Sequence, residues 1–269
     1  MYSIVAISRA ERFSPNSVEK DAAILESVVK ELRYKGCDVA LKKETELKDN
    51  VGATLFLSMG RLPSTLSLLS ERQDSGAAVV NSAASVELCC NRRRLNDVLA
   101  AAGVPLAPSE GDQGYWLKRA DGVAESKADV QYAANKTEAE ATMKRMLAQG
   151  MGDVIACAHV EGDLLKFYGV RGTGFFRYYY PGDDGDWKFD DEARNGMPQH
   201  YDFNDKELAD TADRAAQAVG LDVYGGDCIV SSNGKFCVID LNDWPSFSRC
   251  RTEAAKAIAV RTLQILKKK

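Results

Sequence analysis

Short apolar runs of strand length alternate with amphipathic segments over the first 80 residues, and this order constrains the fold more than any other feature of the chain. In the segment 17–35 the apolar residues recur at helical spacing, and Gly36 follows at a position that often ends a helix. A second helix is expected to begin with Ser64 as its N-terminal cap, directly after Pro63. The order strand, helix, strand, strand, helix, strand predicts a small α/β unit with a mainly parallel sheet. Its strands are expected at residues 3–8, 38–41, 54–58 and 77–80.

Beyond residue 83 the same spacing rules predict further elements, and several strands follow one another without a helix between them. Turn residues separate these strands, as in Glu161-Gly162-Asp163, and the stretch 187–202 is expected to be rich in loops. The expected helices are 84–89, 92–102, 137–149, 205–219 and 252–266, and the expected strands are 116–119, 130–133, 154–160, 164–170, 174–180, 227–231 and 236–241.

The composition excludes several classes of protein. The chain has 269 residues, of which 45% are hydrophobic, and this is enough for a large core in one or two domains. Its net charge is −4 with both signs mixed along the chain, so it has no broad attraction for nucleic acid or an anionic membrane. No apolar stretch approaches the roughly 20 residues that cross a bilayer, and the N-terminus reads as a strand and not as a signal peptide. We expect a cytoplasmic monomer or homodimer.

The cysteines and histidines do not form a metal or disulfide pattern. The chain contains seven cysteines, an odd number, and no two of them have the C-x-x-C spacing. It contains two histidines and no H-E-x-x-H motif. We therefore expect no zinc site and no disulfide framework, and we expect most of these cysteines to be small buried apolar residues.

Three oxygen-bearing side chains lie at the ends of two neighbouring expected strands. Asp227 begins one strand, and Asp240 and Asn242 end the next. The tight turn at Asn233-Gly234 between them predicts an antiparallel hairpin, in which the start of the first strand and the end of the second lie together. Positions 240 and 242 also share a face, because strand side chains alternate with a period of two. The three side chains are therefore expected to converge.

Two carboxylates and an amide oxygen, without sulfur or imidazole, suit a hard cation. Mg²⁺ is the first choice, because it binds few protein oxygens and completes its shell with water and phosphate, and Mn²⁺ is the alternative. The plainer interpretation is a hairpin whose acidic ends lie in solvent. The apolar run 236–239 that leads into these acceptors favours the metal site.

These residues resemble the metal-binding motif of the ATP-grasp superfamily, in particular its RimK-like carboxylate–amine ligases. That motif has an Asp on one strand, then an acidic residue, one spacer and Asn on the next strand, and a proline afterwards. Asp227, Asp240, Asn242 and Pro245 stand in this order. Upstream, the segment Gly103-Val104-Pro105-Leu106-Ala107-Pro108 is similar to a connection that the family shares. The resemblance covers residues 80–250.

The resemblance implies a domain plan and cofactors. A small parallel-sheet α/β domain at residues 1–83 would precede an ATP-grasp domain at residues 84–269, whose two subdomains have α+β character. The central lid subdomain would occupy residues 112–158. The fold class is then α/β overall, and the expected cofactors are ATP and Mg²⁺.

The resemblance also assigns nucleotide contacts to individual residues. Arg92 and Lys118 are expected to reach the phosphates of ATP, because a triphosphate needs cations beside the metal. The carbonyl of Ala158 and the N–H of Val160 are expected to bind adenine, and Asp163 to bind the ribose hydroxyls. The alternatives are a solvated arginine cluster for Arg92, an edge-strand lysine for Lys118 and an ordinary turn for Asp163.

The chain departs from the family pattern in two places. Cys157 and Ala158 stand where a Gln-Glu pair often precedes the adenine-binding strand, although recognition by the backbone needs no particular side chain. The segment 121–127, where a phosphate lid is expected, is short and contains a single glycine.

The expected reaction is ligation, in which a carboxylate is activated as an acyl phosphate and attacked by an amine. A kinase that phosphorylates a hydroxyl, of the inositol-phosphate type, and a nucleotide-binding module without turnover are the alternatives. None of these needs a nucleophilic side chain, in agreement with the lack of a convincing Ser/His/Asp or Cys/His arrangement.

The substrate is expected beside the segment that follows the metal motif. Ser246, Arg249 and Arg251 are the expected contacts, so an anionic small-molecule or peptide carboxylate is the predicted substrate. Lys166 is expected to face the γ-phosphate or the substrate, and Arg194 to stabilise the transferring phosphoryl group. The alternative for each arginine is a surface role. The aromatic strand 174–180 is expected to be mainly sheet core, with a pocket wall as the alternative.

Overall fold

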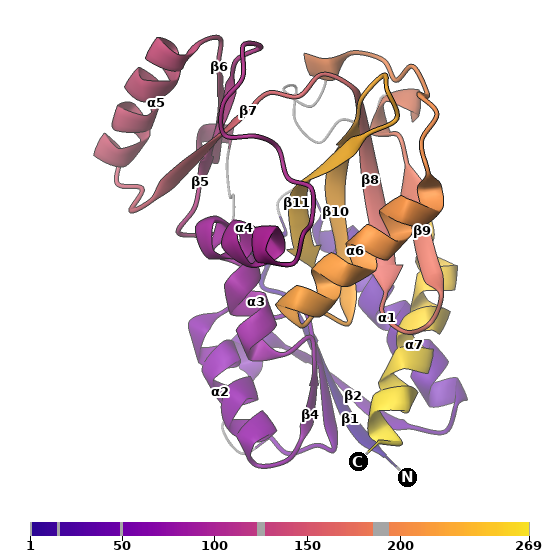
Figure 1. The fold of residues 1–269 in the computed structure, drawn as a ribbon. Helices are drawn as coiled ribbons and strands as arrows, with labels where there is room; N and C mark the ends of the chain where they lie inside the picture. Colours follow the sequence, from indigo (N-terminus) through magenta and orange to yellow (C-terminus); the bar gives the residue numbers. More distant parts are fainter. Residues whose placement is uncertain (1, 15–16, 49–50, 123–126, 185–193, 269) are drawn as a thin grey trace.

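The computed structural model describes residues 2–14, 17–48, 51–122, 127–184 and 194–268, and it contains three sheets that follow one another along the chain (Figure 1). A parallel sheet lies at the N-terminal end. A three-stranded antiparallel sheet and a four-stranded antiparallel sheet follow it and face each other above it in the view of Figure 1.

The N-terminal sheet has the strand order β2-β1-β3-β4, and every neighbouring pair is parallel, as the sequence predicts. Its interior strands β1 and β3 are apolar except for serines at their ends, because helices cover both faces of such a sheet. The elements are β1 (Ser3–Ser8), α1 (Val18–Tyr34), β2 (Asp38–Lys43), β3 (Leu55–Ser58), α2 (Pro63–Asp74) and β4 (Ala78–Val80).

The expected start of α2 is wrong by one position. The helix begins at Pro63, which occupies the first helical turn, and Leu62 at the cap position makes no side-chain cap. Proline is pre-organised for this position because its φ is fixed near the helical value. The carboxylate of Glu44 accepts the N–H groups of Arg61 and Leu62, both at 2.8 Å. A distant carboxylate thus binds donors at the helix entrance, and Ser64 is not needed as a cap.

The three-stranded sheet lies within residues 112–158, where the lid subdomain is expected, and it is called the lid below. Its order is β6-β5-β7, from β5 (Tyr115–Arg119), β6 (Val130–Ala133) and β7 (Val154–Ala158), with antiparallel pairing throughout. Helix α5 (Lys136–Ala148) packs on one face, where Leu117 and Met146 are fully buried. Figure 1 shows α5 on the side away from the C-terminal sheet. Trp116 and Lys118 alternate with Leu117, so they project from the opposite face.

The C-terminal sheet has the order β11-β10-β8-β9, with antiparallel pairing throughout. Helix α6 (Asp205–Val219) covers one face and shares a core cluster with Leu165, Phe167 and Cys228. Lys166 and Asp227 alternate with these residues and therefore project from the other face. The strands are β8 (Asp163–Val170), β9 (Phe175–Tyr179), β10 (Val223–Val230) and β11 (Phe236–Asp243).

The hydrophobic core of the N-terminal sheet continues into the C-terminal part of the chain. Helix α7 (Arg251–Leu266) packs against α1, and its alanines join a cluster that also contains Trp244 and Phe247. The predicted boundary after residue 83 falls at the first residue of α3 (Ala83–Cys89), which leads through α4 (Arg92–Ala101) to the lid. The boundaries at 83, 112 and 158 stay predictions. One hydrophobic core crosses the first of them.

Three of the seven cysteines are buried, fewer than the composition led us to expect. No helix in the described part of the chain is both long and apolar enough to cross a bilayer. All seven cysteines are free thiols, and Cys37, Cys228 and Cys237 are buried. Burial raises the pKa of the Cys228 thiol well above its ordinary value, so this cysteine behaves as a small apolar residue.

Asn81 ties the N-terminal sheet to the C-terminal sheet. It directly follows β4 and is fully buried. Its Nδ2 donates to the carbonyl of Val223 at 2.7 Å, and its Oδ1 accepts the N–H groups of Asp222 at 2.8 Å and Val223 at 2.9 Å. One side chain thus satisfies three backbone groups where β10 begins.

We expect Asn81→Ala to lower the free energy of unfolding by about 3 kcal/mol or more, because it leaves buried backbone groups without partners. Urea denaturation at an unchanged m-value measures the loss. Asn204→Ala is the matched control, because Asn204 caps α6 at the surface and its loss should cost about 1 kcal/mol. Equal losses in the two variants would contradict the proposed connection between the sheets.

Candidate functional site

Charged side chains from three adjacent strands form a row on the open face of the C-terminal sheet. Asp227 on β10 stands directly opposite Lys166 on β8 and Asp240 on β11. Lys166 Nζ lies 3.8 Å from Asp227 Oδ1, and Asn242 Nδ2 donates to Asp240 Oδ2 at 3.3 Å. The predicted hairpin is therefore present, and it brings Asp227, Asp240 and Asn242 to the same end.

A β-bulge in β11 turns the two acceptors toward this open face. The pairing moves from Asp227 with Asp240 to Cys228 with Val238, so Ile239 is an extra residue. Val238 and Leu241 both belong to the core under α6, although they are three positions apart. In a regular strand Asp240 would share the face of Val238. This bulge has no signal in the sequence, because Ile239 is an ordinary strand residue.

Lys118 from the lid contacts the bulge. Its Nζ donates to the carbonyl of Ile239 at 2.9 Å. The carbonyl belongs to the extra residue, which a bulge leaves outside the regular ladder. Lys118 therefore reaches from β5 across to β11, next to Asp240, as a lysine that binds phosphates beside the metal would need to do.

The run of three arginines at the start of α4 divides between two partners. Arg92 Nη1 lies 3.1 Å from Asp240 Oδ1, and both side chains are largely buried. Arg93 forms a two-pronged contact with Asp153 at 2.6 and 2.7 Å, and this pair is exposed. Arg94 is exposed. Arg92 is thus part of the site, and its neighbours are not.

The donor set matches a hard cation and not a transition metal. In the described ranges, no group of three or more His, Cys, Asp and Glu side chains can hold a metal ion. The site instead combines two carboxylates with one amide, and the cations Arg92, Lys118 and Lys166 surround them. Such a set suits Mg²⁺ that shares its shell with phosphate oxygens.

The end of β7 provides backbone groups at the junction of lid and C-terminal sheet. The N–H of Ala158 donates to Pro108 O at 2.7 Å, and the N–H of His159 donates to Gly114 O at 2.8 Å. In the part of the chain that the structure describes, the N–H of Val160 has no hydrogen-bond partner. This donor is the one assigned to adenine, and the assignment of Ala158 and Val160 stays a prediction.

Asp163 is buried and binds the backbone of a distant segment. It is only 3% exposed, and its two carboxylate oxygens accept the N–H groups of Gln199 at 2.7 Å and Tyr201 at 2.9 Å. The side chain therefore holds the segment before α6 in place. Each carboxylate oxygen can accept a second hydrogen bond, and the expected ribose contact stays a prediction.

Arg194 lies beside the lid and not beside the carboxylates. Its guanidinium is 3.5 Å from the centre of the Tyr132 ring on β6. Tyr132 packs edge-on against Trp116 and His159, and Trp116 Nε1 donates to His159 Nδ1 at 3.0 Å. Residues 185–193, which precede Arg194 in the expected loop, and residues 123–126 of the expected phosphate lid lie outside the described part.

The residues expected to bind substrate cluster beyond Asn242. Arg249 lies 4.2 Å from the centre of the Tyr179 ring, and Tyr179 stands opposite Lys166. The hydroxyls of Tyr179 and Tyr168 are 2.8 Å apart, and burial raises the pKa of both. The aromatic strand is therefore more than sheet core, because it links Arg249 to the charged row.

Arg251 and Ser246 lie near the N-terminus of α7. Arg251 is the first residue of that helix, and its Nε is buried without a hydrogen-bond partner among the described residues. Ser246 is partly buried in the turn that precedes the helix. A buried guanidinium N–H at a helix N-terminus is a donor that suits an anion.

Asp243, Arg61 and Arg9 also lie at the site, although no motif in the sequence marks them. Asp243 follows Asn242 and projects from the opposite face of β11, where it is 2% exposed. Burial alone would raise the pKa of Asp243, but Arg61 and then Arg9 outweigh it and hold this pKa below its usual range. The signal that the sequence offers is the acidic residue next to Asn242. Its partners Arg61 and Arg9 lie far upstream, so no local pattern connects them to it.

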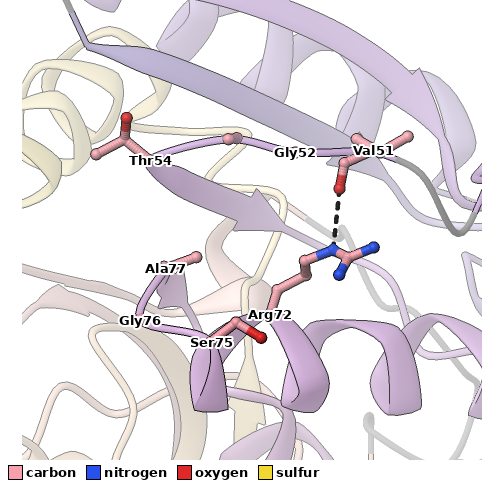
Figure 2. Close-up of a pocket in the computed structure, with 8 residues that line it drawn as sticks. Val51, Gly52, Thr54, Arg72, Ser75, Gly76 and Ala77 are labelled. Atoms are coloured by element: carbon pink, nitrogen blue, oxygen red, sulfur yellow. Dashed lines mark hydrogen bonds between the residues drawn. The ribbon is translucent and has the colours of Figure 1, made fainter.

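A cavity of about 430 Å³ lies elsewhere, at the opposite edge of the N-terminal sheet (Figure 2). Thr54 and Ala77, which precede β3 and β4, line it, and Arg72 Nε donates to Val51 O at 3.0 Å across it. Ligands of α/β sheets bind at the carboxyl ends of the strands, and this cavity is at the amino ends. It is therefore not part of the charged site.

Comparison with known proteins identifies the architecture. No protein-family model matches the sequence, and no curated protein shows significant similarity to it. Solved structures do match. A RimK domain protein, ATP-grasp, from Sphaerobacter thermophilus superposes with a TM-score of 0.67 over 97% of this chain and 99% of its own, at 17% identity. The chain has the ATP-grasp fold. The family resemblance read from the motifs is thus confirmed at the level of the fold.

Two further structures share the fold over nearly their full length. VanG, a D-Ala:D-Ser ligase from Enterococcus faecalis, has a TM-score of 0.70 at 12% identity, with 98% of this chain and 99% of that chain covered. A D-alanine–D-alanine ligase from Bacillus anthracis, complexed with ATP, has a TM-score of 0.66 at 10% identity, with 99% and 98% covered. The ATP-grasp architecture therefore extends over the N-terminal sheet as well.

We expect the pKa of His159 to lie below the value of about 6.5 for an unperturbed histidine. Burial disfavours the imidazolium, and the charge of Arg194 disfavours it further. Neutral His159 therefore stabilises the fold above pH 6.5, and this contribution is lost as the pH falls through the lowered pKa. Arg194→Ala should raise the pKa without restoring it fully, because burial remains.

NMR titration of the two histidines measures this effect, with His200→Gln to assign the signals. Arg93→Ala is the control, because Arg93 pairs with Asp153 at the surface. An unchanged or lower pKa of His159 in Arg194→Ala would show that Arg194 does not stand beside this ring.

Proposed function

We propose that the chain is an ATP- and Mg²⁺-dependent ligase that activates a carboxylate as an acyl phosphate and joins it to an amine. The observation that carries the proposal is the row of Lys166, Asp227 and Asp240 on the open face of the C-terminal sheet. Lys118 reaches the end of this row from the lid. The ATP-grasp fold, shared with a ligase whose structure contains ATP, supports the choice of nucleotide.

The metal would be held by Asp227, Asp240 and Asn242, with Mn²⁺ as the alternative to Mg²⁺. When bound, it would offset the charge that develops on the phosphate oxygens. Around it, Arg92, Lys118 and Lys166 would bind the phosphates of ATP and orient the γ-phosphate. Adenine would lie beside the end of β7, within reach of the Val160 N–H and the Ala158 carbonyl.

The chemistry needs no nucleophile from the protein. A carboxylate oxygen of the substrate attacks the γ-phosphorus, the bond from that phosphorus to the β–γ bridging oxygen breaks, and ADP leaves. The amine then attacks the acyl carbon, the carbon–oxygen bond to the phosphate breaks, and inorganic phosphate leaves while the amine loses a proton to solvent. The cations of the site orient both anions and stabilise the transferring group.

The acid substrate would approach from the side of α7. Arg249, Arg251 and Ser246 lie beyond Asn242, and the Nε of Arg251 is buried without a hydrogen-bond partner among the described residues. Arg249 stacks on Tyr179, which stands opposite Lys166. An anionic small molecule or peptide that carries a carboxylate fits these donors. Arg194, on the other side near the lid, remains a candidate for contact with the phosphates only if the lid moves.

Product analysis tests the proposal. We expect ADP and inorganic phosphate to appear only when both a carboxylic acid and an amine from a panel of amino acids and short acidic peptides are present. The ligated product would be detected by mass spectrometry. A phosphorylated hydroxyl product would instead identify a kinase, and nucleotide binding without turnover over the whole panel would identify a non-catalytic module.

We expect Asp240→Asn to lower ATP turnover by about 10²–10³-fold, the range for loss of one preorganised electrostatic stabiliser. Asp153→Asn is the matched control, because Asp153 pairs with Arg93 just as Asp240 pairs with Arg92, but at the exposed edge of the lid. Thermal unfolding establishes that both variants are folded. Full turnover in Asp240→Asn would refute the assignment of this carboxylate to the metal.

A further inference from the structure

Asp243 is held by a buried two-pronged ion pair that crosses between the sheets. Arg61 Nε donates to Asp243 Oδ2 at 3.2 Å, and Arg61 Nη2 donates to Oδ1 at 2.5 Å. The side chain of Asp243 is 1% exposed and that of Arg61 is 10% exposed. A paired guanidinium and carboxylate of this geometry define direction as well as distance. The strand that carries Asp240 and Asn242 is therefore fixed from the N-terminal sheet.

Arg9 holds the backbone that follows. Its Nη2 donates to the carbonyl of Trp244 at 2.9 Å and to that of Asp243 at 3.3 Å, and its Nη1 donates to Asp21 at 3.2 Å. The side chain of Arg9 is 7% exposed. Both carbonyls come directly after Asn242, so this arginine determines where the chain leaves β11.

The turn that Arg9 holds has an unfavourable backbone conformation. Trp244 has a φ of 42° and Phe247 a φ of 49°, and both side chains are fully buried. Bulky residues rarely adopt positive φ, and they do so only where the surroundings impose it. The contacts of Arg9 and the burial of the two rings impose it here, directly beside the expected metal ligands.

Backbone contacts to one carboxylate hold the segments that carry Arg9 and Arg61. They follow β1 and β3, at the carboxyl ends of the parallel sheet, where such sheets place functional residues. The carboxylate of Glu44 accepts the N–H groups of Ala10, Arg61 and Leu62, so it binds the backbone on both sides of this edge. The segments that carry the two arginines are therefore held in place where the arginine side chains contact the end of β11.

We propose that Arg61 and Arg9 are positioning residues for the metal site, which act through Asp243 and the two carbonyls that follow Asn242. Asp243 and Asn242 are neighbours on opposite faces of one strand, so a rotation of the backbone at Asp243 displaces the amide oxygen of Asn242. Since Asn242 Nδ2 also donates to Asp240 Oδ2, the displacement reaches the second ligand. The inference rests on the proposed function, because it assumes that these residues bind the metal.

The alternative is a role in folding stability alone. A buried carboxylate with two arginine partners is costly to break wherever it stands. Asp222 provides the comparison, because it is 8% exposed and lies 2.8 Å from Arg171 Nη2 and 2.6 Å from Arg261 Nη2. It resembles Asp243 in burial and partners, but it precedes β10 and does not adjoin an expected metal ligand.

The experiment compares Asp243→Asn with Asp222→Asn in the full-length protein. Mn²⁺ affinity is measured by electron paramagnetic resonance of free Mn²⁺ in the presence of saturating ADP, and ADP affinity is measured separately without metal. We expect Asp243→Asn to weaken Mn²⁺ binding by about 10-fold or more, the effect of losing a residue that orients a metal ligand. Asp222→Asn should leave the affinity unchanged, even if its thermal stability falls as far.

Arg61→Lys keeps the positive charge but loses the two-pronged contact, and it serves if Asp243→Asn does not fold. A weakened Mn²⁺ affinity in folded Arg61→Lys supports the positioning role. Mn²⁺ affinity equal to that of the wild type in either folded variant, or an equal loss in Asp222→Asn, would overturn it. Absence of Mn²⁺ binding in the wild-type protein would overturn the proposed metal site itself, and this inference with it.

Discussion

The pairing of β10 with β11, including its one extra residue, is the constraint on which the site depends. Without Ile239 as a bulge, the period of two would turn Asp240 toward α6, where Val238 and Leu241 are buried. The bulge lets one strand supply apolar residues to the core and acceptors to the open face. It also exposes a carbonyl that Lys118 reaches from the lid, so the same irregularity links the two antiparallel sheets.

Charge balance at the site follows from this arrangement. Asp227 and Asp240 are partly buried and stand beside Lys166 and Arg92, which offset the cost of removing carboxylates from water. With a triphosphate and its metal bound, each of these side chains would exchange its partner. The carboxylates would bind the metal, and the lysine and arginine side chains would bind the phosphates. The ion pairs of the protein are thus compatible with the proposed function, because each side chain would gain a new partner of opposite charge.

The features of the site that depend on a few neighbouring residues could be predicted from the sequence, and contacts between distant segments could not. The turn at Asn233-Gly234 and the alternation of strand side chains were enough to bring Asp227, Asp240 and Asn242 together, because these rules act over a few residues. The bulge left no local signal, since Ile239 is an ordinary strand residue. Arg61 and Asp243 are 182 positions apart, and their pairing depends on how two sheets meet. The contacts of Asp163 were not foreseen for the same reason, because its partners lie beyond the long loop.

The N-terminal sheet supports the end of the hairpin that β10 and β11 form. One hydrophobic cluster runs from β1 and α1 into Trp244, Phe247 and α7, so the sheet would expose this surface if it folded alone. Polar contacts join the same two parts of the chain. Asn81, Arg9 and Arg61 all lie just beyond the carboxyl ends of parallel strands, and they bind the ends of β10 and β11. The edge where an α/β sheet commonly binds its ligand is here occupied by the protein's own hairpin of β10 and β11. A change in the first 80 residues can therefore alter the site without touching a ligand.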